Sequence, residues 1–201
     1  MKMRGDFAMK TIIYAHPYVG SFNHEILNRL SNYFSMHDEE FEIIDLYGDD
    51  FDPLLRGENL ATYSEGKTDD EKVKRYQRKI AGSNELVFIF PIWWQSVPAM
   101  LKGFLDKTML KGFAYNEDNG WEGLLTYIKK VTVITTSTVT KSYLQTECGD
   151  PIQKVFINRT LVDLGIDAKN VNWIHFGEAN TTTDEKRGKF LDDIPMLYKQ
   201  E

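Results

Sequence analysis

Short apolar runs alternate along this chain with longer stretches whose apolar residues recur at helical spacing. Five runs are rich in β-branched or aromatic residues, and several are almost continuously apolar. They are Thr11–Ala15, Phe41–Leu46, Leu86–Phe90, Val131–Thr135 and Val171–Phe176. Continuous apolar runs of this length are typical of strands buried on both faces of a parallel sheet. The sequence therefore predicts five such strands.

The stretches between and after these runs place apolar residues three or four positions apart, which indicates amphipathic helices. The predicted helices are Asn23–Met36, Asp69–Ala81, Pro98–Lys107, Pro151–Leu164 and Glu185–Leu197. Gly165 directly follows the fourth of them and is a typical helix stop. This alternation predicts a parallel sheet with helices on both faces and right-handed crossovers. Ligands bind such sheets at the carboxyl ends of the strands, so the loops there are the candidates for function.

Length and composition fit one globular domain. The chain has 201 residues, 42% hydrophobic and 27% charged, and one domain usually takes roughly 100–200 residues. The regular pattern begins at Met9, so we expect a single domain over 9–201 and an N-terminal extension over 1–8. The net charge of −6 argues against a nucleic-acid partner, because such domains are usually basic.

Cysteine and histidine usage narrows the chemistry. Cys148 is the only cysteine, which rules out an internal disulfide and a cysteine-based metal site and favours a cytoplasmic location. His24, His37 and His175 show no metal-ligand spacing, so we expect no metal site. No run approaches the ~18 apolar residues of a membrane span, and we expect no integral membrane segment.

The loop His16–Asn23 (HPYVGSFN) follows the first predicted strand and opens the first predicted helix. Ser21 or Asn23 can cap that helix, and the free backbone N–H groups of its first turn can bind an anion. His16 and the Ser21 hydroxyl add further donors. These features indicate a phosphate cradle that lacks the glycine pattern of the common nucleotide loops. An ordinary capped helix after a turn is the alternative.

The loop Pro91–Pro98 (PIWWQSVP) follows the third predicted strand. Two adjacent tryptophans between prolines favour a stiff apolar shelf of the kind that a planar ring can lie against. In an extended strand, adjacent side chains point to opposite faces, so one of Trp93 and Trp94 would then be exposed or face a ligand. A pair of core tryptophans is the alternative.

The loop Thr135–Tyr143 (TTSTVTKSY) follows the fourth predicted strand and is rich in hydroxyl groups. Its side chains and backbone could hydrogen bond to the polar edge of a ring. Taken alone, this loop is better interpreted as a solvated polar segment.

Four segments in this order resemble the flavodoxin-like NAD(P)H:quinone oxidoreductase family, which includes the modulator-of-drug-activity type and the ancillary reductases of potassium efflux systems. They are HPYVGSFN, FPIWWQSVPAMLKGFLDK, GFAY at Gly112–Tyr115, and TTSTVTKSY. The second segment is the most specific, and the resemblance covers about residues 10–197. It implies an α/β fold: a flavodoxin-like three-layer α/β/α sandwich whose five-stranded parallel sheet has the order 2-1-3-4-5.

The resemblance also implies an activity. A bound flavin, with FAD favoured over FMN, would take hydride at its N5 atom from NAD(P)H and pass it to a quinone-like acceptor in a ping-pong cycle. A homodimer is implied as well. Two alternatives remain open: a flavodoxin-type electron carrier, and a regulatory flavoprotein subunit of a membrane transporter. The segment that ends in GFAY favours the enzyme over the carrier.

Family roles can be carried to matching positions of this chain. The residues that match the family loop binding the phosphate end of the flavin are His16, Ser21, Phe22 and Asn23. The segment along the isoalloxazine ring comprises Pro91, Ile92, Trp93, Trp94 and Gln95. The residues that match the family loop over the pyrimidine side of the ring are Thr135, Thr136, Ser137, Thr138 and Tyr143. The adenosine half of FAD falls to Arg187 and Leu191. The walls of the substrate pocket fall to Trp94 and Tyr115.

The chain departs from the family at two places near the flavin, and in the acceptor pocket a second family tyrosine is replaced, with Glu117 following Tyr115. Ser137 and Thr138 stand where the family often has two glycines, so side chains there are expected to narrow or reshape the contact with the ring. Cys148 lies near the position of a family histidine at the reacting end of the flavin. Without that histidine, Tyr143 is the expected catalytic group that stabilises charge on the flavin.

Overall fold

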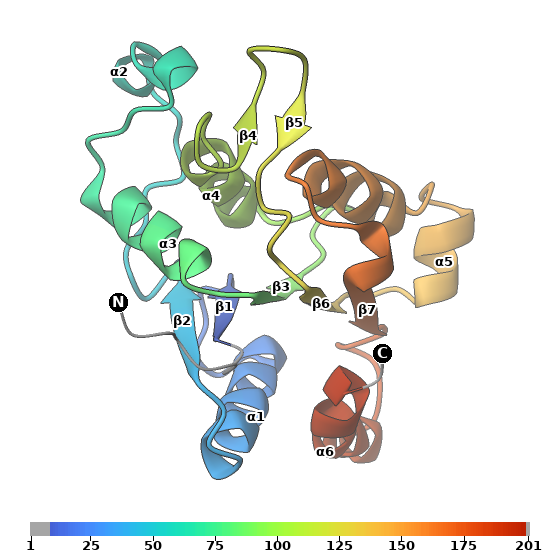
Figure 1. The fold of residues 1–201 in the computed structure, drawn as a ribbon. Coiled ribbons are helices and arrows are strands. Elements are labelled where there is room, and N and C mark those ends of the chain that lie inside the picture. The colour runs from blue at the N-terminus through green and yellow to red at the C-terminus, as the bar shows by residue number, and fades with distance from the viewer. Residues whose placement is uncertain (1–8, 200–201) are drawn as a thin grey trace.

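A five-stranded parallel sheet forms the centre of the protein in this computed structural model (Figure 1). The structure describes residues 9–199, so the expected extension over 1–8 lies outside the described residues. The strands are β1 (Lys10–Tyr14), β2 (Phe41–Asp45), β3 (Glu85–Pro91), β6 (Lys130–Thr136) and β7 (Val171–Phe176). Their order is β2-β1-β3-β6-β7. This confirms the five predicted strands and the predicted order 2-1-3-4-5.

Helices cover both faces of this sheet, which completes the predicted three-layer sandwich. On one face lie α1 (Phe22–Met36) and α6 (Asp184–Lys199), which contact each other. On the other face lie α3 (Glu71–Ala81), α4 (Ala99–Thr108) and the helix η2 (Ile152–Leu161) (Figure 1). The shorter helices are α2 (Gly57–Leu60), η1 (Tyr63–Glu65), α5 (Lys141–Thr146) and η3 (Ala168–Asn170). No helix within residues 9–199 is long and apolar enough to cross a membrane.

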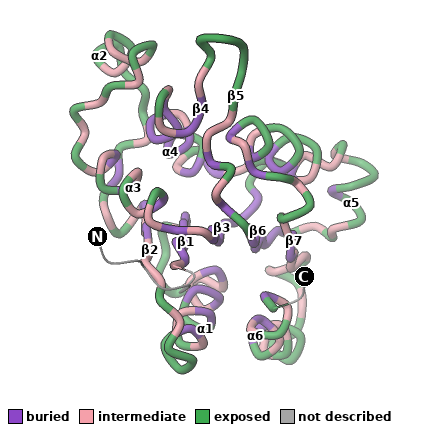
Figure 2. Tube along the Cα trace, in the orientation of Figure 1, coloured by how far each residue is buried: buried purple, intermediate pink, exposed green. Residues whose placement is uncertain are grey.

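Each helical layer packs its own apolar cluster against the sheet. In β3, Phe88 and Phe90 join the cluster under α3, α4 and η2, while Val87 and Ile89 join the cluster under α1 and α6. Successive strand residues point to opposite faces, so a continuously apolar strand serves both clusters. Figure 2 shows the buried residues concentrated in the strands and on the sides of the helices that face them.

The helix η2 is a π-helix, whereas the sequence pattern predicted an α-helix. Its buried residues recur every four or five positions and are Ile152, Phe156, Ile157 and Leu161. The wider i→i+5 winding of a π-helix keeps residues of this spacing on one side. The predicted stop at Gly165 is confirmed, because this residue has a φ of +95° just after the helical segment.

A hairpin that the sequence pattern did not predict follows α4. Its strands, β4 (Tyr115–Asn116) and β5 (Glu122–Gly123), pair antiparallel and are too short for an alternating pattern. The connecting segment contains Gly120 at a φ of +103°. Its base is anchored by a close backbone approach, since a Cβ on Gly123 would lie 2.1 Å from the amide nitrogen of Gly165.

Candidate active site

The three candidate loops meet at the carboxyl ends of β1, β3 and β6, which are neighbours in the sheet. Two contacts join them directly. Asn23 in the first loop donates from its side-chain amide to the hydroxyl of Thr136 in the third, at 2.7 Å. His16 in the first loop lies with its ring centroid 6.0 Å from that of Trp93 in the second. The predicted residues of the three loops are therefore gathered at one edge of the sheet.

The first loop ends in a capped helix. Ser21 is the N-cap of α1 and its hydroxyl accepts from the backbone N–H of His24 at 3.1 Å. A helical N–H donates to the carbonyl four residues earlier, and for Phe22 and Asn23 that carbonyl lies outside the helix. These two N–H groups therefore point out of the helix end, as an anion site would require. The ring of Phe22 packs on that of Phe176, with the centroids 4.8 Å apart. Phe22 can therefore contact a ligand at this helix end through its backbone N–H.

His16 presents a donor in its neutral form. Its Nδ1 accepts from the backbone N–H of Tyr18 at 3.1 Å, so the ring proton of the neutral imidazole sits on Nε2. Partial burial lowers the pKa of His16 below its ordinary value, which favours this neutral form at neutral pH. The side chain thus offers one N–H beside the end of α1.

Asn23 carries an unsatisfied acceptor at the same place. The residue is 3% exposed, and its amide nitrogen is engaged by Thr136. Its Oδ1 atom is buried and has no hydrogen-bond partner within the described part of the chain. A buried polar atom left unpaired costs about 1–3 kcal/mol. A ligand hydroxyl bound between the first and third loops would supply the missing donor.

The second loop is a tight turn and not the stiff apolar shelf that the sequence suggested. Trp93 and Ser96 exchange two backbone hydrogen bonds of 3.1 Å. Trp94 and Gln95 between them have φ values of +51° and +56°, a conformation that costs a non-glycine residue about 1–2 kcal/mol. Trp94 is 95% exposed and Trp93 is 42% exposed. Strained, exposed backbone of this kind is a common feature of ligand-binding segments.

The third loop is shorter than expected. Thr135 and Thr136 belong to β6, and the loop ends at Thr140, whose hydroxyl caps α5 by accepting from the N–H of Tyr143 at 3.1 Å. Tyr143 therefore lies in the first turn of a helix and not in a loop, and the residue is 47% exposed. Six residues of helix gave too little periodicity for the sequence pattern to reveal it.

Arg187, the expected contact for the adenosine half of FAD, is engaged by its own segment. Its guanidinium donates to the carbonyl of Ala179 at 2.8 Å and to the carboxylate of Asp184 at 2.8 and 3.2 Å. These bonds brace the start of α6. The arrangement gives no support to the expected preference for FAD. Within residues 9–199, no three His, Cys, Asp or Glu side chains are gathered as metal ligands.

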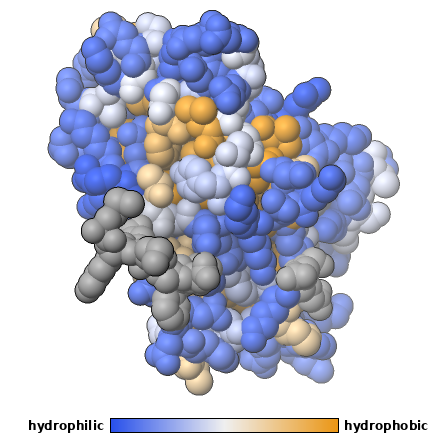
Figure 3. All heavy atoms as spheres, viewed as in Figure 1, coloured by the Kyte–Doolittle hydropathy of each residue, from blue (hydrophilic) through white to orange (hydrophobic). Residues whose placement is uncertain are grey.

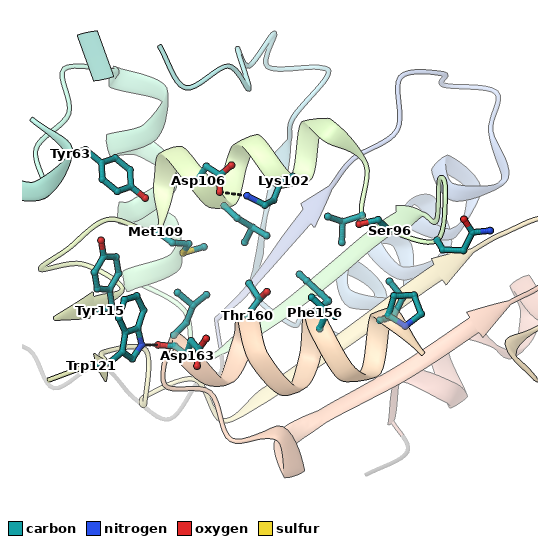
Figure 4. Close-up of a pocket in the computed structure, with 17 residues that line it drawn as sticks. Tyr63, Ser96, Lys102, Asp106, Met109, Tyr115, Trp121, Phe156, Thr160 and Asp163 are labelled. Carbon is teal, nitrogen blue, oxygen red and sulfur yellow. Dashed lines mark hydrogen bonds and ion pairs between the residues drawn. The ribbon is translucent and has the colours of Figure 1, made fainter. Parts of the chain in front are cut away.

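A cavity of about 570 Å³ begins at the second loop and runs between α4 and η2 (Figure 4). Ser96 lies at one end, and Tyr63, Tyr115 and Trp121 lie at the other. Figure 3 shows apolar residues exposed in the middle of this face of the molecule, among hydrophilic surroundings. Of the two predicted pocket walls, Tyr115 lines this cavity, whereas Trp94 is not among its lining residues.

An aromatic pair that the sequence analysis did not identify closes the far end of the cavity. Trp121 stacks on Tyr115 with ring centroids 4.4 Å apart and planes 6° apart. Its indole N–H donates to the backbone carbonyl of Asp163 at 2.7 Å, which ties the hairpin to the end of the η2 segment. The dipeptide Asn119–Gly120 just before it is a strong turn signal that could have revealed the hairpin and this tryptophan.

Comparisons with known proteins place the chain in a family. A family described by a flavodoxin-like fold matches residues 9–187. An uncharacterised NAD(P)H oxidoreductase of Haemophilus influenzae is 30% identical over 183 residues, which are 90% of this chain and 89% of that protein. The structure of an NAD(P)H:quinone oxidoreductase from Methanothermobacter marburgensis is 26% identical, with a TM-score of 0.84 over 96% of this chain and 99% of that one.

A third comparison concerns the fold alone. An FMN-dependent NADH-azoreductase from Bacillus anthracis, solved in complex with FMN, has a TM-score of 0.73 at 19% identity over 95% of this chain and 98% of that one. The family match agrees with the five-stranded parallel sheet of this chain. The chain therefore belongs to the flavodoxin-like family of NAD(P)H oxidoreductases and quinone reductases, and it is an oxidoreductase.

Proposed function

We propose that this protein is a flavin-dependent enzyme that moves hydride from NAD(P)H to a quinone-like acceptor. The observation that carries the proposal is the convergence of the three loops at the carboxyl ends of β1, β3 and β6. An open helix end, an unpaired buried acceptor and an exposed turn that bears two tryptophans lie on these loops. A flavin combines a phosphate, a polyhydroxyl chain and a planar ring, and each part has a matching partner at this site.

The first loop would hold the non-reacting half of the flavin. The phosphate would accept from the N–H groups of Phe22 and Asn23, from the Ser21 hydroxyl and from Nε2–H of His16. The Oδ1 atom of Asn23 would accept a hydrogen bond from a hydroxyl of the ribityl chain. This bond would give the buried oxygen the partner that it lacks.

The second and third loops would hold the ring. We assign its faces and edges to Pro91, Ile92, Trp93, Trp94, Gln95, Thr135, Thr136, Ser137, Thr138 and Tyr143. When bound, the flavin supplies the ability to accept hydride from a nicotinamide and to give it to an acceptor, while the protein supplies position and electrostatics. The Tyr143 hydroxyl is the proposed donor that stabilises negative charge on the ring.

FMN is the flavin that we propose. The guanidinium of Arg187 already binds Ala179 and Asp184, so the feature that would favour the adenosine half of FAD is occupied within its own segment. A protein that shares the fold binds FMN.

The acceptor would enter the cavity between α4 and η2. This cavity shares Gln95 and Ser96 with the second loop, so its near end adjoins the proposed ring site. Its apolar lining and the stacked pair of Tyr115 and Trp121 suit a flat, weakly polar molecule such as a quinone. Nicotinamide and acceptor would use the site in turn, which gives ping-pong kinetics. A cytoplasmic homodimer is part of the same proposal.

Steady-state kinetics with a cavity variant test this assignment. Initial rates over a grid of NADPH and menadione concentrations are expected to give parallel double-reciprocal lines. Val155 lines the cavity and is 60% exposed, so Val155→Trp is expected to raise the KM for menadione about tenfold without changing the flavin content. Val162→Trp, at an exposed position just after η2, is the matched control. An unchanged KM in Val155→Trp would exclude this cavity as the acceptor site.

A further inference from the structure

We propose that His175 is a positioning residue, which holds the third loop in place beside the flavin through a directed chain of hydrogen bonds. The inference rests on the proposed function, because the loop is part of the proposed ring site. His175 lies on β7, next to β6 in the sheet, and its ring meets the side chains of Thr135 and Ser137. These two residues flank Thr136, the partner of Asn23 in the first loop.

Two side-chain hydroxyls contact the imidazole, and its Nε2 atom also lies 3.4 Å from the carbonyl oxygen of Val139. The Nδ1 atom of His175 lies 2.8 Å from the hydroxyl oxygen of Thr135, and its Nε2 atom lies 3.1 Å from the hydroxyl oxygen of Ser137. Both ring nitrogens are therefore engaged by side chains at the carboxyl end of β6 or just beyond it. The ring bridges the last part of the strand and the first residue of the loop.

The neighbouring bonds fix the direction of the chain. The Ser137 hydroxyl donates to the carbonyl of Val139 at 2.6 Å, so its oxygen accepts from Nε2–H of His175. The Nδ1 atom then carries no proton and accepts from the Thr135 hydroxyl. The oxygen of Thr135 in turn accepts from the indole N–H of Trp173 at 2.9 Å. Every donor and acceptor along this chain is thereby satisfied.

The chain requires a neutral histidine. A proton on Nδ1 would compete with the hydroxyl proton of Thr135 for the same contact. Burial is the main cause that lowers the pKa of His175 to about 4, and the nearby ammonium of Lys141 adds to it. At neutral pH the ring is therefore the neutral Nε2–H form that the chain needs.

Backbone packing restrains the same loop from a second direction. The backbone N–H of Ser137 donates to the carbonyl of Phe176 at 3.1 Å. A Cβ on Gly177 would lie 2.5 Å from the carbonyl oxygen of Val139, so the loop and the end of β7 are in tight contact. Lys141, the first residue of α5, donates to the carbonyl of Trp173 at 3.1 Å. β7 thus positions both the loop and the helix that carries Tyr143.

This arrangement revises the expectation for Ser137. A side chain at a position often held by glycine was expected to narrow the contact with the ring. Its hydroxyl instead turns back to Val139 and His175, and the residue is 7% exposed. Ser137 and His175 therefore act as one unit that stiffens the loop.

Four variants test the proposal: His175→Phe, His175→Gln, Ser137→Ala, and the double variant of His175→Phe with Ser137→Ala. FMN affinity by fluorescence titration and the visible absorption spectrum of the bound flavin are the readouts. We expect His175→Phe to weaken FMN binding ~10-fold and to alter the spectrum, as the loss of a buried hydrogen-bonding unit would. His175→Gln keeps a donor toward Ser137 and should restore most of the affinity.

The remaining variants separate positioning from general stability. Ser137→Ala should resemble His175→Phe, and the double variant should be no worse than either, because one unit is lost in all three. His37→Phe, at an exposed position at the end of α1, is the matched control. A lower melting temperature in His175→Phe with unchanged FMN affinity and spectrum would overturn the positioning role, and so would additive losses in the double variant.

A readout without flavin keeps the inference apart from the proposed function. Amide hydrogen exchange of the segment 137–140 is expected to speed up in His175→Phe and to stay unchanged in His37→Phe. Unchanged exchange in that segment would overturn the inference. A wild-type protein that binds no flavin would contradict the proposed function, while the exchange experiment would still decide whether His175 holds the loop.

Discussion

The side-chain amide of Asn23 donates a 2.7 Å hydrogen bond to the hydroxyl of Thr136, across 113 positions of the sequence. This bond joins the start of α1, which follows β1, to the end of β6, and β3 lies between β1 and β6 in the sheet. It fixes the orientation of the Asn23 amide, whose Oδ1 atom is buried and has no partner among the described residues. The same residue therefore links the first and third loops, and in the proposed function its Oδ1 atom would accept from the ligand.

Asn23→Ala removes both the bond to Thr136 and the acceptor for a ligand hydroxyl. We expect the dissociation constant for FMN to rise about tenfold, which is the effect of one or two lost hydrogen bonds. Fluorescence titration measures it. Asn32→Ala, at an exposed position of the same helix, is the control and should leave the affinity unchanged. Equal affinities for the two variants would remove Asn23 from the site.

Substitutions at Ser21 separate helix capping from phosphate binding. Ser21→Ala loses the cap and should lower the free energy of unfolding by about 1 kcal/mol. Ser21→Asp keeps a capping oxygen, so its stability in urea should stay near that of the wild type. Its carboxylate would, however, repel a phosphate at the end of α1 and weaken FMN binding at least tenfold. Tight FMN binding by Ser21→Asp would place the phosphate elsewhere.

The turn at Trp94 and Gln95 stores strain that glycine would relieve. Gln95 has a φ of +56°, so Gln95→Gly should raise the free energy of unfolding by up to about 1 kcal/mol. Gln95→Val should lower it, because a β-branched residue tolerates this conformation least. Urea unfolding of both variants checks the order. A stability of Gln95→Val equal to that of Gln95→Gly would show that the turn is unstrained.

The strands and the first helix cap could be predicted because their signals are local. Runs such as Leu86–Phe90 are apolar throughout, and Ser21 stands directly before a periodic stretch. The Asn119–Gly120 signal was equally local, but the paired strands on either side of it have two residues each.

Other features of the site depend on contacts that a sequence pattern does not contain. The partners of His175 lie 38 and 40 positions away, so the sequence showed only an isolated histidine. The left-handed backbone at Trp94 lacks the asparagine or glycine that usually marks such a turn. The helix that Thr140 caps has only six residues, which is too short to show a helical pattern, so the sequence predicts a loop at Tyr143.

The lowered pKa of His175 predicts a pH-dependent contribution to stability. Its pKa is about 4 in the folded protein against 6.5 ordinarily, so the unfolded chain takes up the proton first as the pH falls. The contribution of the neutral ring to the free energy of unfolding is fully present above pH 6.5. It decreases between pH 6.5 and 4, by up to about 3 kcal/mol in all. His175→Phe should lack this component, as urea unfolding at several pH values would reveal. Identical pH dependence in the two proteins would contradict a buried neutral His175.

The central claim is that the three gathered loops hold a flavin that passes hydride from NAD(P)H to a quinone. The most direct measurement is an anaerobic titration of the FMN-reconstituted protein, followed by its visible absorption. We predict one FMN bound per chain, loss of the flavin band on addition of NADPH, and its return on addition of menadione. A protein that binds neither FMN nor FAD, or whose bound flavin keeps its absorption in the presence of NADPH and NADH, would contradict the claim.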